Sequence, residues 1–154
     1  MPVRETVEDH LVAIELALTT IGRHLTRPRL HDRVMRELGV PLDRAGAVLL
    51  RLLDELGDVR LSDLATAAAV DVSTLSRQVS VLVHQGLVAR ATDPLDGRAS
   101  RLTLTPDGRR TLDRLAVVRR TLVAELLTGW SATDRAALAP LLDRLAADLG
   151  RFGS

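Results

Sequence analysis

Apolar residues recur at helical spacing through the first part of the chain. Between Thr6 and about Leu25 they alternate steps of four and three, which predicts a helix that packs against another helix. Pro28 should interrupt this helix, because proline disfavours helical backbone at the residue before it. Two further helices should follow, from Leu30 to Leu38 and from Leu42 to Leu56, each ended by a glycine. The wide apolar face of the latter predicts that it is buried.

After these helices the apolar pattern predicts shorter elements. Val59 to Leu61 has the character of a strand. Two short helices should follow: one capped by Ser62 and running to about Ala69, the other capped by Ser73 and ended by Gly86 in the left-handed conformation. Two short helices joined by a tight turn make a helix-turn-helix candidate.

A β-hairpin is expected next. Leu87 to Arg90 and Arg101 to Leu104 have strand character, and the turn residues Asp93 to Gly97 lie between them, so Arg98 would stand at the tip. The order helix-turn-helix and then hairpin is that of a winged helix.

Asp93 and Asp96 could suggest a metal site or an acid–base pair. We instead expect them to cap the turn and to pair with Arg90 or Arg98, because aspartate commonly stabilises turns and no third ligand is near in sequence.

The C-terminal part should be helical. One helix is expected from Thr105 to about Thr128, and a last one beyond a capping box at Ser131 to Asp134, kinked but not broken at Pro140. The apolar seams of the terminal helices exceed what a small winged-helix core absorbs, so they need a partner. We therefore expect a mainly α fold of the α+β winged helix-turn-helix class, with six to seven helices: the winged helix-turn-helix in 42–105, and helices that need a partner in 1–41 and 106–154.

Composition excludes several functions. The 154 residues include no cysteine, which excludes thiolate catalysis, disulfides and cysteine-ligated metal. One Trp, one Phe and no Tyr leave little for stacking on single-stranded nucleic acid or RNA. We see no nucleophile–base set, phosphate loop or metal cluster, so we expect neither an enzyme nor a cofactor or metal site. Neither a signal peptide nor a membrane span is recognisable, so we expect a cytoplasmic protein.

The net charge of +1 conceals a basic centre. From Val72 to Arg120 there are nine Arg and four Asp, a local charge of +5, whereas the remainder carries −4. All 21 basic residues are Arg, which suits forked contacts to phosphate and guanine. A basic centre between acidic flanks suggests an anionic partner, although a solvated helix face would give the same count.

The second helix of the candidate motif has the side chains that a major-groove helix needs. Its side opposite the leucines is small and polar, with one or two long donors; the residues that fit this need are Ser73, Thr74, Ser76, Arg77 and Gln78. On the helix alone, a plain surface helix explains the pattern equally well. The hairpin shifts the balance, because Arg98 at its tip and Arg101 on its return strand could reach an adjacent groove.

Residues 64–108 resemble the MarR family of winged-helix transcription regulators, above all in the segment VSTLSRQVSVLVHQGLVARATDPLDGRASRLTLTPDG. The resemblance implies major-groove roles for Thr74, Arg77 and Gln78, phosphate roles for Ser73 and Ser76, and a wing contact for Arg98. Gly97 stands where many members have a second Arg, which leaves the strength of that contact open.

The resemblance also implies a homodimer that binds a pseudo-palindromic site on double-stranded DNA, more often as a repressor. On this basis 42–105 is the expected DNA-binding domain, and 1–41 and 106–154 supply the dimerisation helices. Many relatives are released by small effectors, so a small aromatic or carboxylate effector is an open expectation, although the only rings, Trp130 and Phe152, lie near the C-terminus. The alternative function is a winged-helix protein-interaction module without DNA binding.

Overall fold

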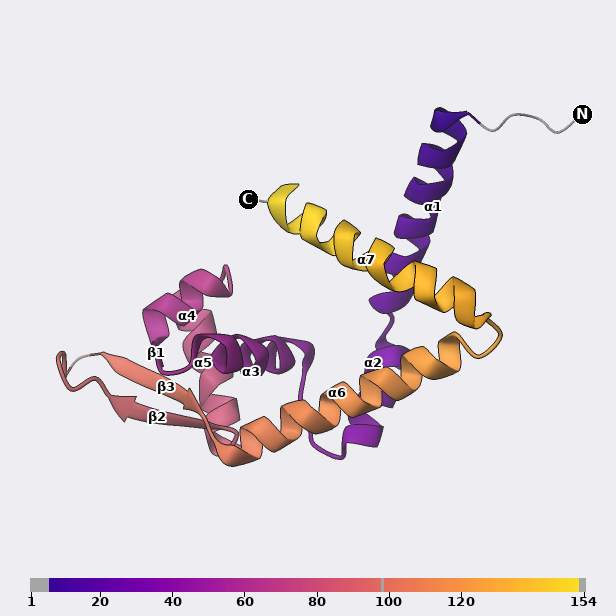
Figure 1. Cartoon of the computed structure of the whole chain (residues 1–154). Helices are drawn as coiled ribbons and strands as arrows, with labels where there is room; N and C mark the ends of the chain where they lie inside the picture. The colour runs from indigo at the N-terminus through magenta and orange to yellow at the C-terminus, as the bar shows by residue number, and fades with distance from the viewer. Residues whose placement is uncertain (1–5, 98, 153–154) are drawn as a thin grey trace, which may run out of the picture. The chain divides into compact units, whose positions relative to one another are not determined.

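The structure is a computed structural model, and it describes residues 6–97 and 99–152. These residues form seven helices and three short strands, which confirms the mainly α winged helix-turn-helix fold (Figure 1). They divide into two compact units between Ala116 and Val117.

The first two helices begin and end where local chemistry dictates. Helix α1 (Val7–Leu25) starts after Thr6, whose hydroxyl accepts a hydrogen bond from the backbone N–H of Asp9 while the Asp9 carboxylate accepts one from the Thr6 N–H. Helix α2 (Pro28–Leu38) begins two residues earlier than predicted, because proline in the first turn lacks a donor that the turn does not use. Gly39 ends α2 with a φ of 69°.

Most of the core of the first unit lies among three helices and strand β3 (Ser100–Leu104), and Leu38, Val88 and Leu115 add to it. Helix α3 (Arg44–Leu56) is capped by Asp43, and α4 (Leu61–Ala67) and α5 (Val72–His84) form the helix-turn-helix. The largest fully buried side chains of these helices and of strand β3 are Leu49, Leu50, Leu53, Leu64, Leu75, Val79, Leu82 and Leu102. Burial of α3 was predicted from its wide apolar face and is confirmed.

Two predicted helix caps are wrong. Ser62 lies inside the first turn of α4, whose N-cap residue is Arg60, because strand β1 (Val59–Arg60) leads directly into the helix. Ser73 lies inside α5, and Asp71 is the N-cap: its Oδ1 accepts a 2.8 Å hydrogen bond from the Thr74 N–H. A carboxylate at this spacing is a strong acceptor for the helix N-terminus, so the helix starts two residues earlier than Ser73 suggested.

The predicted hairpin belongs to a three-stranded antiparallel sheet. Strand β3 (Ser100–Leu104) lies between β2 (Val88–Thr92) and the two-residue strand β1 (Val59–Arg60). Val88 pairs with Leu104, and Arg60 with Arg101. The wing is therefore tied to the chain segment that precedes the helix-turn-helix.

The two C-terminal helices agree with the sequence pattern. Helix α6 (Pro106–Leu126) crosses the division between the units, and α7 (Ala132–Phe152) lies wholly in the second. Helix α7 continues through Pro140, as expected, and Ser131 Oγ accepts the Asp134 N–H at 3.0 Å. Within the described ranges, no helix has the length and apolar character needed to cross a membrane.

Candidate nucleic-acid interface

Helix α5 presents the two sides that the sequence predicted. Leu75, Val79 and Leu82 are buried against the core, which fixes the rotation of the helix. Ser73 and Arg77 are exposed on the other side, and Thr74, Ser76 and Gln78 are half-buried. The small and polar side chains are thus those that remain open to a partner.

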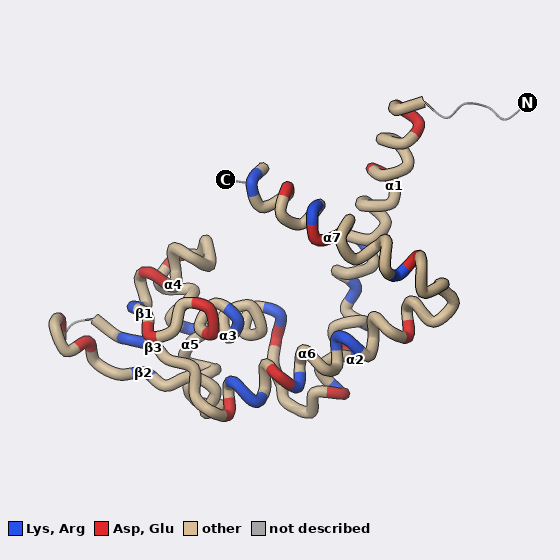
Figure 2. The backbone as a smooth tube through the Cα atoms, in the orientation of Figure 1, with Lys and Arg blue, Asp and Glu red and all other residues tan. Residues whose placement is uncertain are grey.

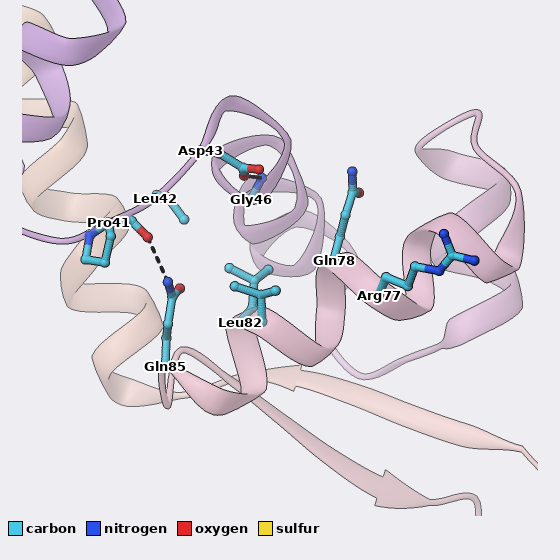
Figure 3. Close-up of a pocket in the computed structure, with 9 residues that line it drawn as sticks. Pro41, Leu42, Asp43, Gly46, Arg77, Gln78, Leu82 and Gln85 are labelled. Atoms are coloured by element: carbon cyan, nitrogen blue, oxygen red, sulfur yellow. Dashed lines mark hydrogen bonds between the residues drawn. The ribbon is translucent and has the colours of Figure 1, made fainter.

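Arg77 and Gln78 extend away from the helix axis (Figure 3). Among the residues that the structure describes, no acidic side chain forms a salt bridge with Arg77, so its donors are available to an external acceptor. This is the accessible cation that a major-groove reading of α5 requires.

The start of α5 is electrostatically fixed. The Ser73 hydroxyl donates to Asp71 Oδ1 at 2.5 Å, and the Thr74 N–H donates to the same oxygen. These hydrogen bonds, that from Ser73 first, hold the pKa of the Asp71 carboxyl well below its usual range. The first turn, which carries Ser73 and Thr74, is therefore anchored by a charged carboxylate.

Arg90 is a site residue that sequence reasoning missed. It lies on β2, and its Nη2 is 3.4 Å from the Ser76 hydroxyl of α5, so it does not pair with Asp93 as predicted. Arg90 is exposed, and its guanidinium lies beside α5, the second helix of the helix-turn-helix. Its position on a strand directly after the helix-turn-helix was the available indication.

The wing aspartates only partly agree with expectation. Asp93 caps the turn, since its Oδ1 accepts the N–H groups of Leu95 and Asp96, but its arginine partners are Arg60 and Arg101. The turn hydrogen bond from Leu95, and then Arg60, lower the pKa of Asp93 against the opposing effect of its burial.

Of the two wing arginines predicted to contact DNA, Arg98 and Arg101, the structure describes only Arg101. Arg98 lies outside the described residues. Arg101 is engaged within the protein, where hydrogen bonding to Asp58 raises the pKa of its guanidinium. A DNA contact by Arg101 stays a prediction.

Many cations of the basic centre have acidic neighbours. Arg109 pairs with Asp54 and Arg110 with Asp107, in addition to the pairs at Arg101. Figure 2 shows basic and acidic positions close together along the strands and the start of α6. The local charge of this segment is therefore partly neutralised inside the protein.

A small pocket lies beside α5 in the first unit. It has a volume of about 290 Å³ and lies between the start of α3, at Asp43 and Gly46, and the face of α5 that carries Gln78 (Figure 3). Gln85 Nε2 donates to the Pro41 carbonyl at 2.7 Å, whereas the buried Gln85 Oε1 accepts no hydrogen bond from the described residues. Within the same described residues, no three His, Asp or Glu side chains are grouped as metal ligands.

Comparison with known proteins agrees with this geometry. Residues 42–100 match the MarR family. The HTH-type transcriptional regulator YxaD of Bacillus subtilis (strain 168) is 36% identical over 86% of this chain and 90% of that protein. The HTH-type transcriptional repressor IacR of Pseudomonas putida is 28% identical over 64% of this chain and 58% of that protein.

The fold also matches solved structures. A MarR family protein from Bacillus stearothermophilus superimposes with a TM-score of 0.78 at 22% identity, over 95% of this chain and 99% of that one. Together with the identity to YxaD, the family match at the helix-turn-helix and the sheet establishes that this chain belongs to the MarR family of transcription regulators.

Proposed function

We propose that the chain is a homodimeric repressor that binds a pseudo-palindromic operator through α5 and the wing. One observation carries the proposal: Arg77 is exposed, without an acidic partner among the described residues, on a helix whose opposite side is fixed in the core. A fixed helix with an accessible guanidinium and small neighbours suits close approach to base edges.

The proposed contacts follow from the positions of the side chains. Thr74, Arg77 and Gln78 would face base edges in the major groove, and the Ser76 hydroxyl would donate to a phosphate. Ser73 would do the same once DNA draws its hydroxyl proton away from Asp71 Oδ1, to which it donates in the free protein. Arg98 would enter the neighbouring minor groove, where the negative potential favours arginine.

The terminal helices support dimerisation. The seam of α1 is exposed in the single chain: Leu11 is 61% exposed, Ile14 51%, Ile21 49% and Leu25 56%. Exposed apolar seams of this length indicate a partner surface, and we propose that a second copy covers them. A twofold dimer would place half-sites about 10 base pairs apart or a multiple of this.

Repression and release by an effector complete the proposal. The relative IacR is named a repressor, which favours repression over activation here. A small carboxylate effector in the pocket beside Arg77 would compete with DNA for the same guanidinium, because the pocket lining includes that residue.

Selection of bound fragments from random duplexes tests the function directly. A symmetric motif supports an operator bound by a dimer. Arg77→Ala should then reduce base discrimination by about 1–3 kcal/mol at one position of the site. Arg98→Ala should instead weaken binding to all sequences alike, and the slope of log affinity against log salt concentration should fall by about 1. Arg51→Ala, which removes an exposed arginine from α3, is the matched control and should change neither.

Salt titration separates this proposal from the protein-interaction alternative. DNA affinity should fall by roughly 0.9 log units per log unit of salt for each neutralised phosphate. Absence of duplex binding at low salt would favour the interaction module.

The dimer has its own test. Leu18→Glu, on the α1 seam, should shift the protein toward monomer in sedimentation, because a charge would be buried at the interface. Thr20→Glu on the opposite side of α1 is the control. An unchanged dimer in the Leu18 variant would contradict the assignment of α1 to the interface.

A further inference from the structure

Two arginines lie directly opposite each other in the sheet. Arg60 of β1 and Arg101 of β3 are register partners, and like charges in that position destabilise a strand pair. Asp93, at the end of β2, offsets the repulsion: its Oδ2 is 2.7 Å from Arg60 Nε and 3.6 Å from Arg101 Nη1. One carboxylate thus links all three strands.

Asp58 holds Arg101 from the other side. Arg101 Nε lies 2.9 Å from both carboxylate oxygens of Asp58, and Arg101 Nη2 donates to the Asp58 backbone carbonyl at 2.9 Å. Arginine has five N–H donors in a fixed fork, and here they point at two carboxylates and a carbonyl. The side chain of Arg101 is only 30% exposed, so the guanidinium is committed to the protein.

Asp93 also closes the wing loop. Its side chain is 1% exposed, and Oδ1 accepts the Leu95 N–H at 2.8 Å and the Asp96 N–H at 3.2 Å. The backbone adds hydrogen bonds from Asp93 N–H to the Ala99 carbonyl and from Ala99 N–H to the Asp96 carbonyl, both 2.9 Å. The carboxylate that neutralises the two arginines therefore also shapes the loop in which residue 98 occurs.

We propose that Arg101 is a positioning residue of the wing and not a DNA ligand. It acts through Asp58 and Asp93, which fix β3 and the wing loop to β1 and hence to the helix-turn-helix. The inference rests on the proposed DNA binding by the wing. A wing that is already ordered loses less conformational freedom on binding. The three side chains Asp58, Arg101 and Asp93, here called the clamp, therefore increase affinity without touching DNA.

The direction in which one substitution changes DNA affinity tests the proposal. Removing an acidic side chain near DNA ordinarily leaves binding unchanged or strengthens it, because repulsion from the phosphates is lost. Asp58→Ala should do the opposite and weaken binding by about fivefold, since it releases Arg101 and loosens the wing. The matched control, Asp63→Ala, removes an exposed carboxylate from α4 and should bind as the wild type does or more tightly.

The affinity measurement uses fluorescence anisotropy with a labelled duplex recovered by the selection described above. Asp58→Ala, Arg101→Gln and the double variant should weaken binding to a similar extent, because each breaks the same clamp. Tighter binding by Asp58→Ala, together with an Arg101→Gln variant whose salt slope falls by about 0.9, would identify Arg101 as a phosphate ligand and overturn the proposal.

Hydrogen exchange without DNA gives an independent readout. The amides of Leu95 and Ala99 should exchange faster in Asp58→Ala and Arg101→Gln than in Asp63→Ala, with the Leu82 amide of α5 unchanged. Unchanged wing exchange in both clamp variants would overturn the proposal even where DNA binding is normal. Failure of the wild type to bind any duplex would instead refute the proposed function, and the exchange data would still decide whether Arg101 orders the wing.

Discussion

Gly108 in the first turn of α6 is where packing and helix propensity make opposite predictions. A Cβ at this position would lie 2.1 Å from the carbonyl oxygen of Leu87 and 2.7 Å from Leu104 Cδ1. The Leu87 carbonyl is backbone and already accepts the Thr105 N–H at 3.1 Å, so it cannot move aside without losing that bond. Gly108→Ala must therefore push α6 away from the turn that follows α5.

The magnitude follows from two opposing contributions. Replacing glycine by alanine inside a helix ordinarily raises the free energy of unfolding by about 1 kcal/mol. Forcing a methyl group into a filled site costs about 1–3 kcal/mol. Because the clash is with backbone, we expect the cost to lie in the upper part of this range, about 2–3 kcal/mol, which leaves a net loss of about 1–2 kcal/mol and a melting temperature lower by about 4 °C.

Urea unfolding followed by circular dichroism measures this change. Thr66→Ala on α4 is the control for helix propensity, because Thr66 is exposed and lies outside the proposed dimer seam, and it should be at least as stable as the wild type. All variants are compared at one protomer concentration, since dimerisation shifts apparent stability. A Gly108→Ala variant as stable as the wild type would refute the packing argument.

Three further predictions concern single side chains. Asp71→Ala should lower the free energy of unfolding by about 1 kcal/mol and weaken duplex binding, because the first turn of α5 frays without its N-cap. Asp71→Ser, which keeps a capping oxygen, should restore the stability measured by urea unfolding and the duplex affinity measured by anisotropy. The pKa of the Asp93 carboxyl is lowered from 3.8 in the folded protein, so the ionised carboxylate stabilises the fold above pH 3.8. This stability is lost as the pH falls through the folded-state pKa. Asp93→Asn lacks the titrating group and should therefore lose less stability than the wild type when the pH is lowered from about 5 to about 2 in acid titrations. Leu53→Ala, at a side chain 1% exposed, should cost about 2–5 kcal/mol in urea unfolding, whereas Leu56→Ala on the same helix should cost far less.

The helices could be predicted because their evidence is local. Apolar spacing alone located α1, α3, α6 and α7, and Gly39 and Gly86 ended helices with positive φ as expected. The errors were small: the starts of α2, α3, α4 and α5 were misplaced, and the predicted ends of α4 and α6 ran about two residues too far. Ser73 and Asp71 are both good capping residues two positions apart, and only the backbone geometry decides which carbonyl begins the helix.

The wing pairs could not be predicted from nearby residues. Asp93 was expected to pair within its own hairpin, but its nearest cation comes from 33 residues earlier, and Arg101 reaches 43 residues back to Asp58. Both contacts depend on β1 joining the sheet beside β3, a pairing of only two residues. Periodicity carries no information on such a pairing, because a two-residue strand has no period.

A count of arginines along a segment overstates the charge that a partner meets. The nine arginines between Val72 and Arg120 suggest a strongly basic surface, yet the structure pairs Arg101, Arg109 and Arg110 with carboxylates. Two exposed cations of the candidate interface have no acidic partner among the described residues: Arg77 on α5, and Arg90, whose guanidinium reaches Ser76 of α5 from the sheet. A few cations in fixed positions favour discrimination between sequences, whereas an unpaired run of nine would favour any polyanion, since contacts to phosphate alone carry no sequence information. If the proposed DNA binding holds, the carboxylates Asp58, Asp54 and Asp107 should favour specificity by competing for arginines that would otherwise contact DNA of any sequence.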